Sequence, residues 1–347
     1  MSETKNLLLH LKNLCNIAGV SGNESNVSDY IINNLPNTCT YEIDPLGNLI
    51  VNKKGENSSK ADKKLMIVAH MDEVGFIINA ITEDGMLKFS SVGGIDKRVV
   101  FQRAVEIGEN KVYGIIGANP IHLLKSDEVD QAVKIENMYI DIGATTKEEA
   151  EKLISLGDYA NFLPNYETFG YGFIKSKAID DRFGCAVMLN LLKKSFEYDL
   201  VFVFAVQEEI GLIGSTVAAF SQNPDFALVI DATTAGDVAG VSEEDSVCKL
   251  SGGGVITIMD RHTIYDRQLV NLVMDTAKQN NINAQFKRAV AGGNDAGAVH
   301  KSRGGVRTVA ISLPTRYIHS ENCVAKISDI ESTAKLINKA IEEIIKL

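Results

Sequence analysis

The stretch LVFVFAVQEEIGLIGSTVAAF, residues 200–220, combines a strand signal with a helix signal. Residues 200–206 are apolar without interruption, which is typical of a strand buried on both faces of a sheet. Residues 214–220 are predicted to form a helix directly after it. A strand followed at once by a helix is the repeating unit of α/β proteins, so this stretch favours an α/β fold.

The same alternation extends through most of the second half of the chain. Residues 185–192 and 327–347 are predicted helices, and the second of them has apolar residues at amphipathic spacing. Further buried strands are predicted at residues 65–69, 226–230, 255–259 and 308–312. Strands that alternate with helices imply a mostly parallel sheet with helices on both faces.

The N-terminal part of the chain is predicted to add two helices and two strands. The first helix spans residues 7–18. Ser21-Gly22-Asn23-Glu24 has the pattern of a capping box that starts the second helix. Residues 40–43 and 49–51 are predicted strands on either side of a turn.

Residues 75–141 have a different texture, with short β-type runs broken by glycines. One of these runs is residues 99–107. Such spacing indicates a small antiparallel barrel or sandwich. We therefore predict a β-rich domain at residues 73–165, inserted into an α/β domain formed by residues 1–72 and 166–347.

The composition is that of a soluble globular protein. The 347 residues are 45% hydrophobic and 23% charged, and no apolar run approaches the roughly 18 residues that span a bilayer. The net charge of -10 argues against nucleic acid and anionic membranes as partners. The five cysteines are scattered and odd in number, which is typical of a reducing compartment. Because the polar N-terminus lacks the features of a signal peptide, we expect a cytoplasmic protein.

Acidic residues and histidines follow several of the apolar runs, at the edge where open α/β sheets bind their ligands. His70 and Asp72 are two positions apart in an extended segment, so their side chains point the same way. Asp72 can therefore hydrogen-bond the His70 ring and fix its tautomer, as carboxylates do for metal-binding histidines.

Two pairs of adjacent carboxylates each allow two interpretations. Asp180 and Asp181 precede a predicted helix, so they fit either a helix N-terminus, whose dipole favours acids, or a cation site. Glu208 and Glu209 follow the strand at residues 200–206. They fit either a solvated strand end or a metal ligand beside a general base.

Asp231 and His319 complete the candidate set, the first at the end of an apolar run and the second in the segment 312–320. The inventory is then two histidines and several carboxylates, without cysteine. This mixture suits a pair of divalent ions such as Zn, Co or Mn. One carboxylate would bridge them at a separation of roughly 3.5–4 Å.

Five segments, in this order along the chain, resemble the M42 family of metallo-aminopeptidases, which includes glutamyl and deblocking aminopeptidases of the tetrahedral type. They are AHMDEVGF (69–76), AIDDRFGC (178–185), VQEEIGLIGS (206–215), AGGNDAGAVH (291–300) and SLPTRYIHS (312–320). The predicted insertion lies where this family carries its β-rich dimerisation domain. The resemblance implies a zinc-exopeptidase-like fold and the removal of N-terminal residues from peptides with a free N-terminus. It also implies a homo-oligomer in which dimers assemble into a dodecamer.

The resemblance further implies two divalent metal ions per subunit, Zn or Co, with Mn as a third choice. His70 and Asp231 are expected to hold one ion, while Glu209 and His319 hold the other. Asp180 is expected to bridge both ions. Metal-activated water would then attack the first peptide bond of the substrate.

The resemblance makes Glu208 the general base and Asp72 the partner of His70. Two positions depart from the family pattern. The family often has histidine where this chain has Thr234, and threonine where it has Asn294. Neither position is an expected ligand, so the departures bear on substrate preference and not on metal binding.

Two other functions are open to the same residues. A glycosidase also needs two carboxylates, and members of this family have been labelled endoglucanases, but that chemistry does not require histidines and the chain has no Trp. A non-catalytic assembly protein, or a different metal-dependent hydrolase, is the second alternative, although every expected ligand and the base are present. For substrate preference, Arg261 and His262 either place positive charge near a side-chain pocket, which would favour acidic N-terminal residues, or belong to solvated surface.

Overall fold

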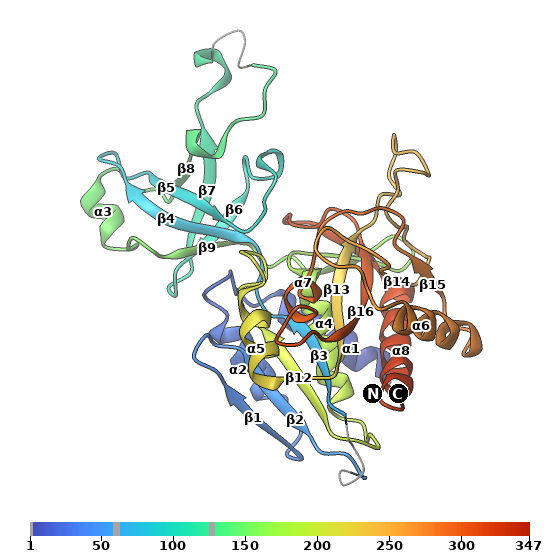
Figure 1. The fold of residues 1–347 in the computed structure, drawn as a ribbon. Coiled ribbons are helices and arrows are strands. Elements are labelled where there is room, and N and C mark those ends of the chain that lie inside the picture. Colours follow the sequence, from blue (N-terminus) through green and yellow to red (C-terminus); the bar gives the residue numbers. More distant parts are fainter. Residues whose placement is uncertain (1–2, 58–62, 125–128) are drawn as a thin grey trace.

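A mixed sheet of eight strands lies at the centre of the larger part of the molecule (Figure 1). The computed structural model describes residues 3–57, 63–124 and 129–347 of the chain. The four central strands, β12, β3, β13 and β16, are parallel and arise from the apolar runs of the sequence. In spatial order the strands are β1 (Cys39–Ile43), β2 (Leu49–Lys53), β12 (Leu200–Ala205), β3 (Leu65–His70), β13 (Phe226–Thr234), β16 (Arg307–Thr315), β14 (Gly254–Ile256) and β15 (Ala284–Phe286).

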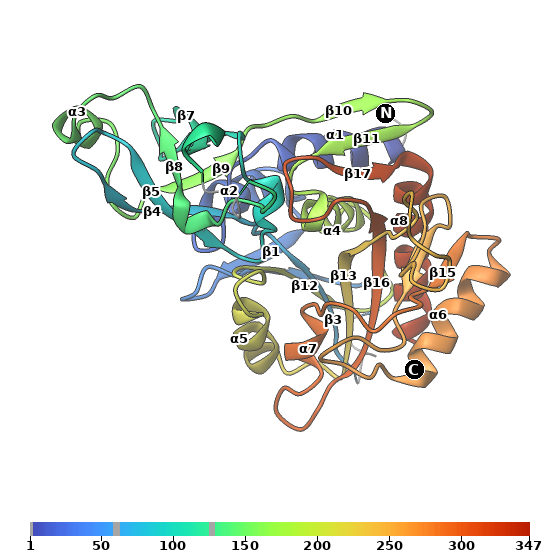
Figure 2. The same ribbon diagram turned by 90° about the horizontal axis from the view of Figure 1, so that it is seen from above.

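Helices cover both faces of this sheet (Figure 2). On one face α4 packs on the central strands, flanked by α1 and α8, and α6 packs against α8. On the other face lie α5 and α7. Their bounds are α1 (Glu3–Cys15), α2 (Ser25–Ile32), α4 (Ile179–Leu191), α5 (Ile213–Gln222), α6 (Arg267–Gln279), α7 (Ala296–Val299) and α8 (Ile327–Ile344). The predicted α/β fold is confirmed. None of the helices in the described part of the chain has both the length and the apolar composition to cross a membrane.

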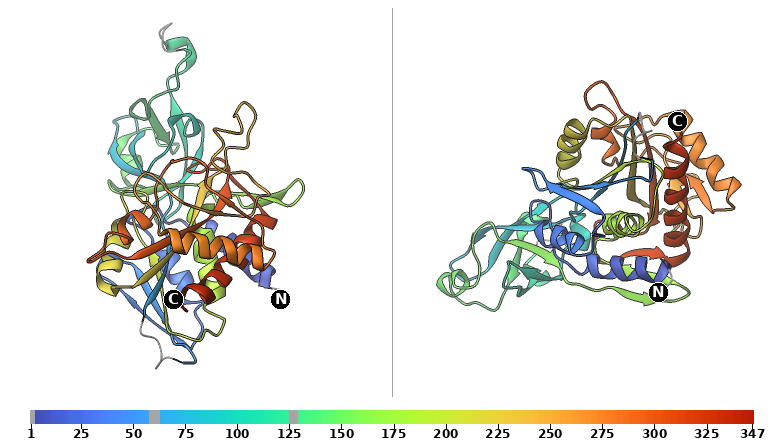
Figure 3. Two further views of the ribbon diagram at one scale, coloured as in Figure 1. Left: turned by 45° about the vertical axis from the view of Figure 1, so that its right-hand side comes forward. Right: turned by 90° about the horizontal axis from the view of Figure 1, so that it is seen from below.

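The inserted segment forms a closed barrel of six antiparallel strands, which confirms the predicted β-rich insertion. The barrel stands to one side of the large sheet (Figure 3). It has a hydrophobic core of its own, in which the Phe76 ring packs edge-on against Phe89 and Phe162 at centroid distances of 5.1 and 5.5 Å. The strands in barrel order are β4 (Gly75–Ile81), β5 (Leu87–Val92), β8 (Met138–Asp141), β7 (Val112–Ala118), β6 (Ala104–Ile107) and β9 (Tyr159–Phe162).

The remaining elements are short. Three of them, β10 (Glu167–Phe169), β11 (Phe173–Ser176) and β17 (Cys323–Lys326), form a small antiparallel sheet. The remaining helical turns, all in the barrel segment, are η2 (Lys97–Val99), η3 (Ile121–Leu123), η4 (Ile135–Asn137) and α3 (Lys147–Glu151).

Several local predictions are wrong, and the strand expected at residues 255–259 ends already at Ile256. The strand expected at residues 99–107 begins only at Ala104, because η2 and a left-handed Gln102 (φ 63°) occupy its first half. The expected capping box does not form either. Ser21 donates its hydroxyl hydrogen to Asp72 instead of capping α2, and the side chain of Glu24 accepts hydrogen bonds from Gly22 N and Gln207 N.

A buried ion-pair cluster lies where the chain passes from β3 into the barrel. The Glu73 carboxylate accepts hydrogen bonds from Lys177 Nζ at 2.6 and 2.8 Å and lies 3.5 Å from Arg182 Nη2. The exposed fraction of each of these three side chains is 3% or less. Glu73 is thus the counter-ion that keeps two cations inside the protein.

We expect Glu73→Gln to lower the free energy of unfolding by about 3–5 kcal/mol, because it leaves two buried cations without a countercharge. Glu243→Gln is the matched control, since Glu243 pairs with Arg288 on the surface and such pairs contribute little. Urea denaturation of both variants measures the difference. Equal midpoints for the two variants would show that the buried cluster does not depend on the charge of Glu73.

Candidate active site

The candidate residues meet at the carboxyl ends of the parallel strands. His70 is the last residue of β3 and pairs in register with Ala205, the last residue of β12. Glu208 and Glu209 lie three and four residues after the end of β12. Asp231 lies inside β13, which continues to Thr234, so the predicted end of that strand was too early. The sheet topology therefore gathers residues that are far apart in the sequence at one edge.

Two overlapping groups of potential metal ligands share one carboxylate. His70, Asp180 and Asp231 form the first group, and Asp180, Glu209 and His319 form the second. In each group the ligand atoms lie within 4.8 Å of one another. All five residues predicted as ligands are thus brought together.

Asp180 lies between the two histidines. Its Oδ1 is 3.2 Å from His70 Nε2, and its Oδ2 is 3.4 Å from His319 Nε2. His319 Nε2 also lies 3.2 Å from Glu209 Oε2. Because one oxygen of Asp180 faces each group, this carboxylate has the position that a bridging ligand requires.

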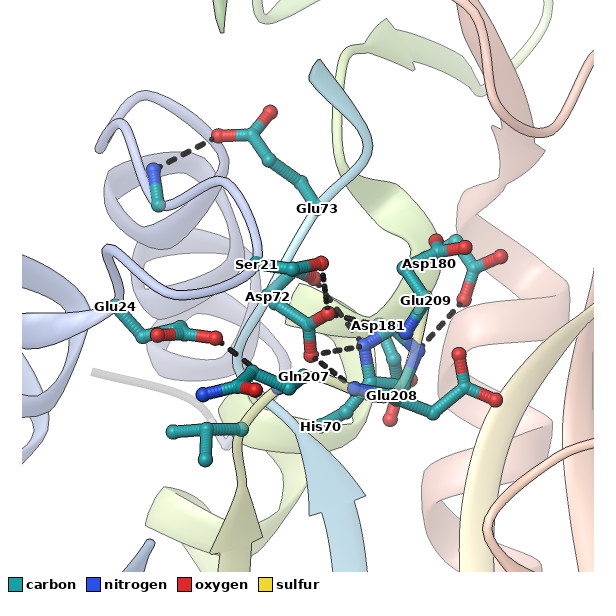
Figure 4. A network of polar contacts seen from close by, with 12 residues as sticks. Ser21, Glu24, His70, Asp72, Glu73, Asp180, Asp181, Gln207, Glu208 and Glu209 are labelled. Atoms are coloured by element: carbon teal, nitrogen blue, oxygen red, sulfur yellow. Dashed lines mark hydrogen bonds and ion pairs between the residues drawn. The ribbon is translucent and has the colours of Figure 1, made fainter. Parts of the chain in front are cut away.

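Asp72 organises the segment that carries the two glutamates (Figure 4). Its carboxylate accepts hydrogen bonds from Glu208 N at 2.9 Å, Glu209 N at 3.1 Å and Ser21 Oγ at 2.6 Å. Asp72 Oδ1 lies 3.4 Å from His70 Nδ1, and Nδ1 also hydrogen-bonds the Asp72 carbonyl oxygen at 3.1 Å. Both acceptors favour a proton on Nδ1, which leaves Nε2 free to face Asp180.

Glu208 points its carboxylate into the same cluster, where it forms a third ligand group with His70 and Glu209. Burial raises the pKa of Glu208 well above its usual range, and the nearby carboxylates add to the shift. No described residue donates a hydrogen bond to its side chain, in contrast to Asp72. The Glu208 carboxylate is therefore available to exchange protons with a bound molecule.

The start of α4 separates the roles of the adjacent aspartates. Ala178 is left-handed (φ 54°), Asp180 and Asp181 have non-helical dihedrals, and the peptide bond between them is cis. Asp181 accepts a hydrogen bond from Gly184 N and so fits the helix N-terminus, while its buried Oδ2 has no hydrogen-bond partner among the described residues. Asp180 faces the cluster. The helix N-terminus interpretation thus applies to Asp181, and the cation-site interpretation applies to Asp180.

The inserted barrel supplies part of the site. His319 Nδ1 donates to the carbonyl oxygen of Gly94, in the loop that follows β5, at 2.8 Å. Two residues further on, Glu321 pairs with Arg103 of the barrel segment at 3.0 Å. The Gly94 contact fixes the tautomer of His319 just as Asp72 does for His70.

The cluster contains more carboxylates than histidines. Burial raises the pKa values of Glu209 and Asp231, and in Asp231 the negative charge of Asp180 adds to the effect. Burial alone would lower the pKa of His319, but its contacts with Asp180 and Glu209 raise it to about 11. The site therefore holds more carboxylate charge than its histidines offset. Divalent cations fit this donor set of imidazole nitrogens and carboxylate oxygens.

A cavity of about 150 Å³ opens next to the cluster. Thr234 and Asn294, the two positions that depart from the family pattern, line it, and so does Lys287. Arg261 and His262 are exposed and do not line it; His262 packs behind Gly293, where an added Cβ would lie 2.3 Å from its Nδ1. Sequence reasoning missed Lys287 because no motif surrounds it.

Comparison with known proteins extends over nearly the whole chain. Residues 47–336 match the sequence profile of the family described as M42 glutamyl aminopeptidase. The glutamyl aminopeptidase of Lactococcus lactis is 34% identical over 336 residues, which cover 92% of this chain and 91% of that protein. The lysyl aminopeptidase of Pyrococcus furiosus is 30% identical over 346 residues, 96% of each chain.

A solved structure is similar throughout. The TET1 peptidase of Pyrococcus horikoshii, which can assemble into a tetrahedron or a large octahedral shell, superposes with a TM-score of 0.84 at 34% identity. The match covers 96% of this chain and 98% of that one. The family resemblance predicted from five short segments is confirmed, and the chain belongs to the M42 family of aminopeptidases.

Proposed function

We propose that this aminopeptidase uses two divalent metal ions and a glutamate general base to remove N-terminal residues from peptides. The observation that carries the proposal is the position of Asp180, which presents one oxygen to each of two ligand groups. His70 and Asp231 would complete one ion site, and Glu209 and His319 the other. The donor set suits Zn or Co, and Mn as a further choice.

The bound ions would polarise the scissile carbonyl and lower the pKa of the attacking water. Glu208 would take a proton from that water and pass it to the leaving amine. Asp72 positions this base through its hydrogen bond to Glu208 N and orients His70 at the same time. The free α-amine of the substrate is attracted to the carboxylates of the cluster, which favours cleavage at the first peptide bond.

We further propose that residues 73–165 are a dimerisation domain and that dimers assemble into a dodecamer. The barrel segment exposes large apolar side chains: the exposed fractions are 56% for Tyr113, 68% for Ile121 and 67% for Leu123. Exposed apolar groups of this size are common at subunit contacts. The remainder, residues 1–72 and 166–347, is the catalytic domain. The five cysteines are all free thiols, in keeping with a place in the cytoplasm.

Hydrolysis of aminoacyl-p-nitroanilides tests the proposal. The protein is stripped with a chelator and then resupplied with Zn, Co or Mn, and release of nitroaniline is recorded. We expect activity to return with metal, at two ions per chain, and to vanish when the substrate amine is acetylated. Binding of two ions without any hydrolysis would leave a different hydrolase or a non-catalytic assembly protein, and full activity after stripping would exclude metal dependence.

A further inference from the structure

We propose that Glu24, at the start of α2, is a positioning residue for Glu208, because its carboxylate holds the main-chain N–H group of the residue before that base. This inference rests on the proposed function, since it takes Glu208 to be the general base. Glu24 does not line the cavity beside the ligand cluster, so it acts through the main chain and not on the substrate.

The segment that carries the base, residues 206–209, follows β12 without forming a helix or a strand. Each of its four consecutive N–H groups donates to a side chain of another segment. The acceptors are Asn48 Oδ1 for residue 206 at 3.0 Å, Glu24 Oε1 for residue 207 at 3.0 Å, and the two oxygens of Asp72 for residues 208 and 209 at 2.9 and 3.1 Å. Side chains thus satisfy donors that a neighbouring strand would satisfy in a sheet, so the place of the base depends on them.

The hydrogen bond from Gln207 N to Glu24 is made immediately before Glu208 in the chain (Figure 4). Gln207 is left-handed, with a φ of 56°. This conformation is uncommon for a residue other than glycine and persists only where the surroundings hold it. Glu24 Oε1 also accepts from Gly22 N at 2.8 Å, so one oxygen ties the main-chain turn at Gln207 to the N-terminal segment.

Glu24 is an unusual residue for the start of a helix. Its exposed fraction is 6%, and burial raises its pKa to about 6, with the negative charge of Asp72 adding to the shift. Among the described residues no cation pairs with it. Ser, Thr or Asn would cap the helix without burying a charge. A buried carboxylate is better explained by the strong hydrogen bonds that an ionised acceptor forms with main-chain N–H groups, one of which precedes the base.

Two substitutions at residue 24 separate these hydrogen bonds from packing. Glu24→Met keeps the size of the side chain and removes both acceptor oxygens, whereas Glu24→Gln keeps one. With aminoacyl-p-nitroanilides we expect Glu24→Met to lower kcat about 10-fold or more, because a displacement of about 1 Å can cost about 10²-fold in rate. KM and the content of two ions per chain should stay unchanged. Glu24→Gln should restore most of the activity, because the amide oxygen also accepts hydrogen bonds.

The other end of α2 offers a matched control. Asn34 Nδ2 donates to Tyr30 O at 2.8 Å there. Asn34→Ala therefore loosens the same helix without touching residues 206–209. We expect this variant to lower the melting temperature and to leave kcat unchanged.

Combination with Glu208→Gln tests whether Glu24 acts through the base. If it does, Glu24→Met should lower kcat little further once residue 208 is glutamine. An equal loss in both backgrounds, the loss of an ion in Glu24→Met, or the same fall in kcat in Asn34→Ala would overturn the inference. An undiminished kcat in Glu24→Met would do the same and leave the aminopeptidase proposal intact. Failure of the wild type to cleave any substrate would instead reject the proposed function.

Discussion

Glu208→Gln is expected to lower kcat/KM for aminoacyl-p-nitroanilides by about 10³-fold, without loss of bound metal. The amide keeps the shape of the side chain but cannot take a proton from water. The backbone of residue 208 would still donate to Asp72, so the ligand geometry is retained. Because proton transfer fails while substrate binding persists, the loss should appear in kcat and hardly in KM.

Three measurements make this result specific. Metal content by elemental analysis should remain at two ions per chain, and thermal stability should match that of the wild type. Glu243→Gln, on the surface, serves as the control for the loss of one carboxylate. A Glu208→Gln variant that retains more than about a tenth of wild-type activity would show that another group acts as the base.

Asp180→Asn is expected to abolish activity for a different reason, which is loss of both metal ions. Asp180 is the residue shared by the ligand group that contains Asp231 and the ligand group that contains His319. The amide cannot supply a negative oxygen to each group, so the affinity of both sites should fall. We expect fewer than one ion per chain after dialysis and a loss of activity of at least about 10³-fold, on the scale of two-metal catalysis.

Single-site variants provide the comparison for Asp180→Asn. Asp231→Asn removes a ligand from the group with His70 and Asp180, and Glu209→Gln removes one from the group with Asp180 and His319. Each is expected to retain one ion per chain. If Asp180→Asn also retained one ion, Asp180 would belong to a single site and the bridging assignment would be rejected.

The central strands were predictable because their sequence carries one dominant signal. Strands β3 and β12 are buried along their whole length, and every position except His70 is apolar, so each run is visible without knowledge of the fold. The histidine that ends β3 and the glutamates that follow β12 stand out against these apolar runs. The helix α6 was not predicted, although Asp266 caps it, because its polar face masks the apolar spacing in a short window.

The parts of the site that could not be predicted depend on contacts between distant segments. Ser21 looked like a helix cap because its local pattern fits one, but the buried Asp72 carboxylate is the stronger acceptor. The partner of His319 is the main-chain oxygen of Gly94, to which any residue type could contribute. Lys287 follows β15, and two other strands of the sheet separate β15 from β13, so the place of Lys287 in the cavity depends on the whole sheet. No periodicity encodes such proximity.

The hydrogen bond from His319 to Gly94 connects the proposed second ion site to the barrel. Through this contact, ion binding and subunit association can affect each other. If docking of another subunit on the barrel shifts the Gly94 loop and weakens ion binding by some factor, ion binding must weaken that docking by the same factor. Assembly and metal loading would then be one coupled equilibrium. A subunit without bound metal would then differ from a metal-bound one in its affinity for other subunits, even though the ions lie outside the contact surface.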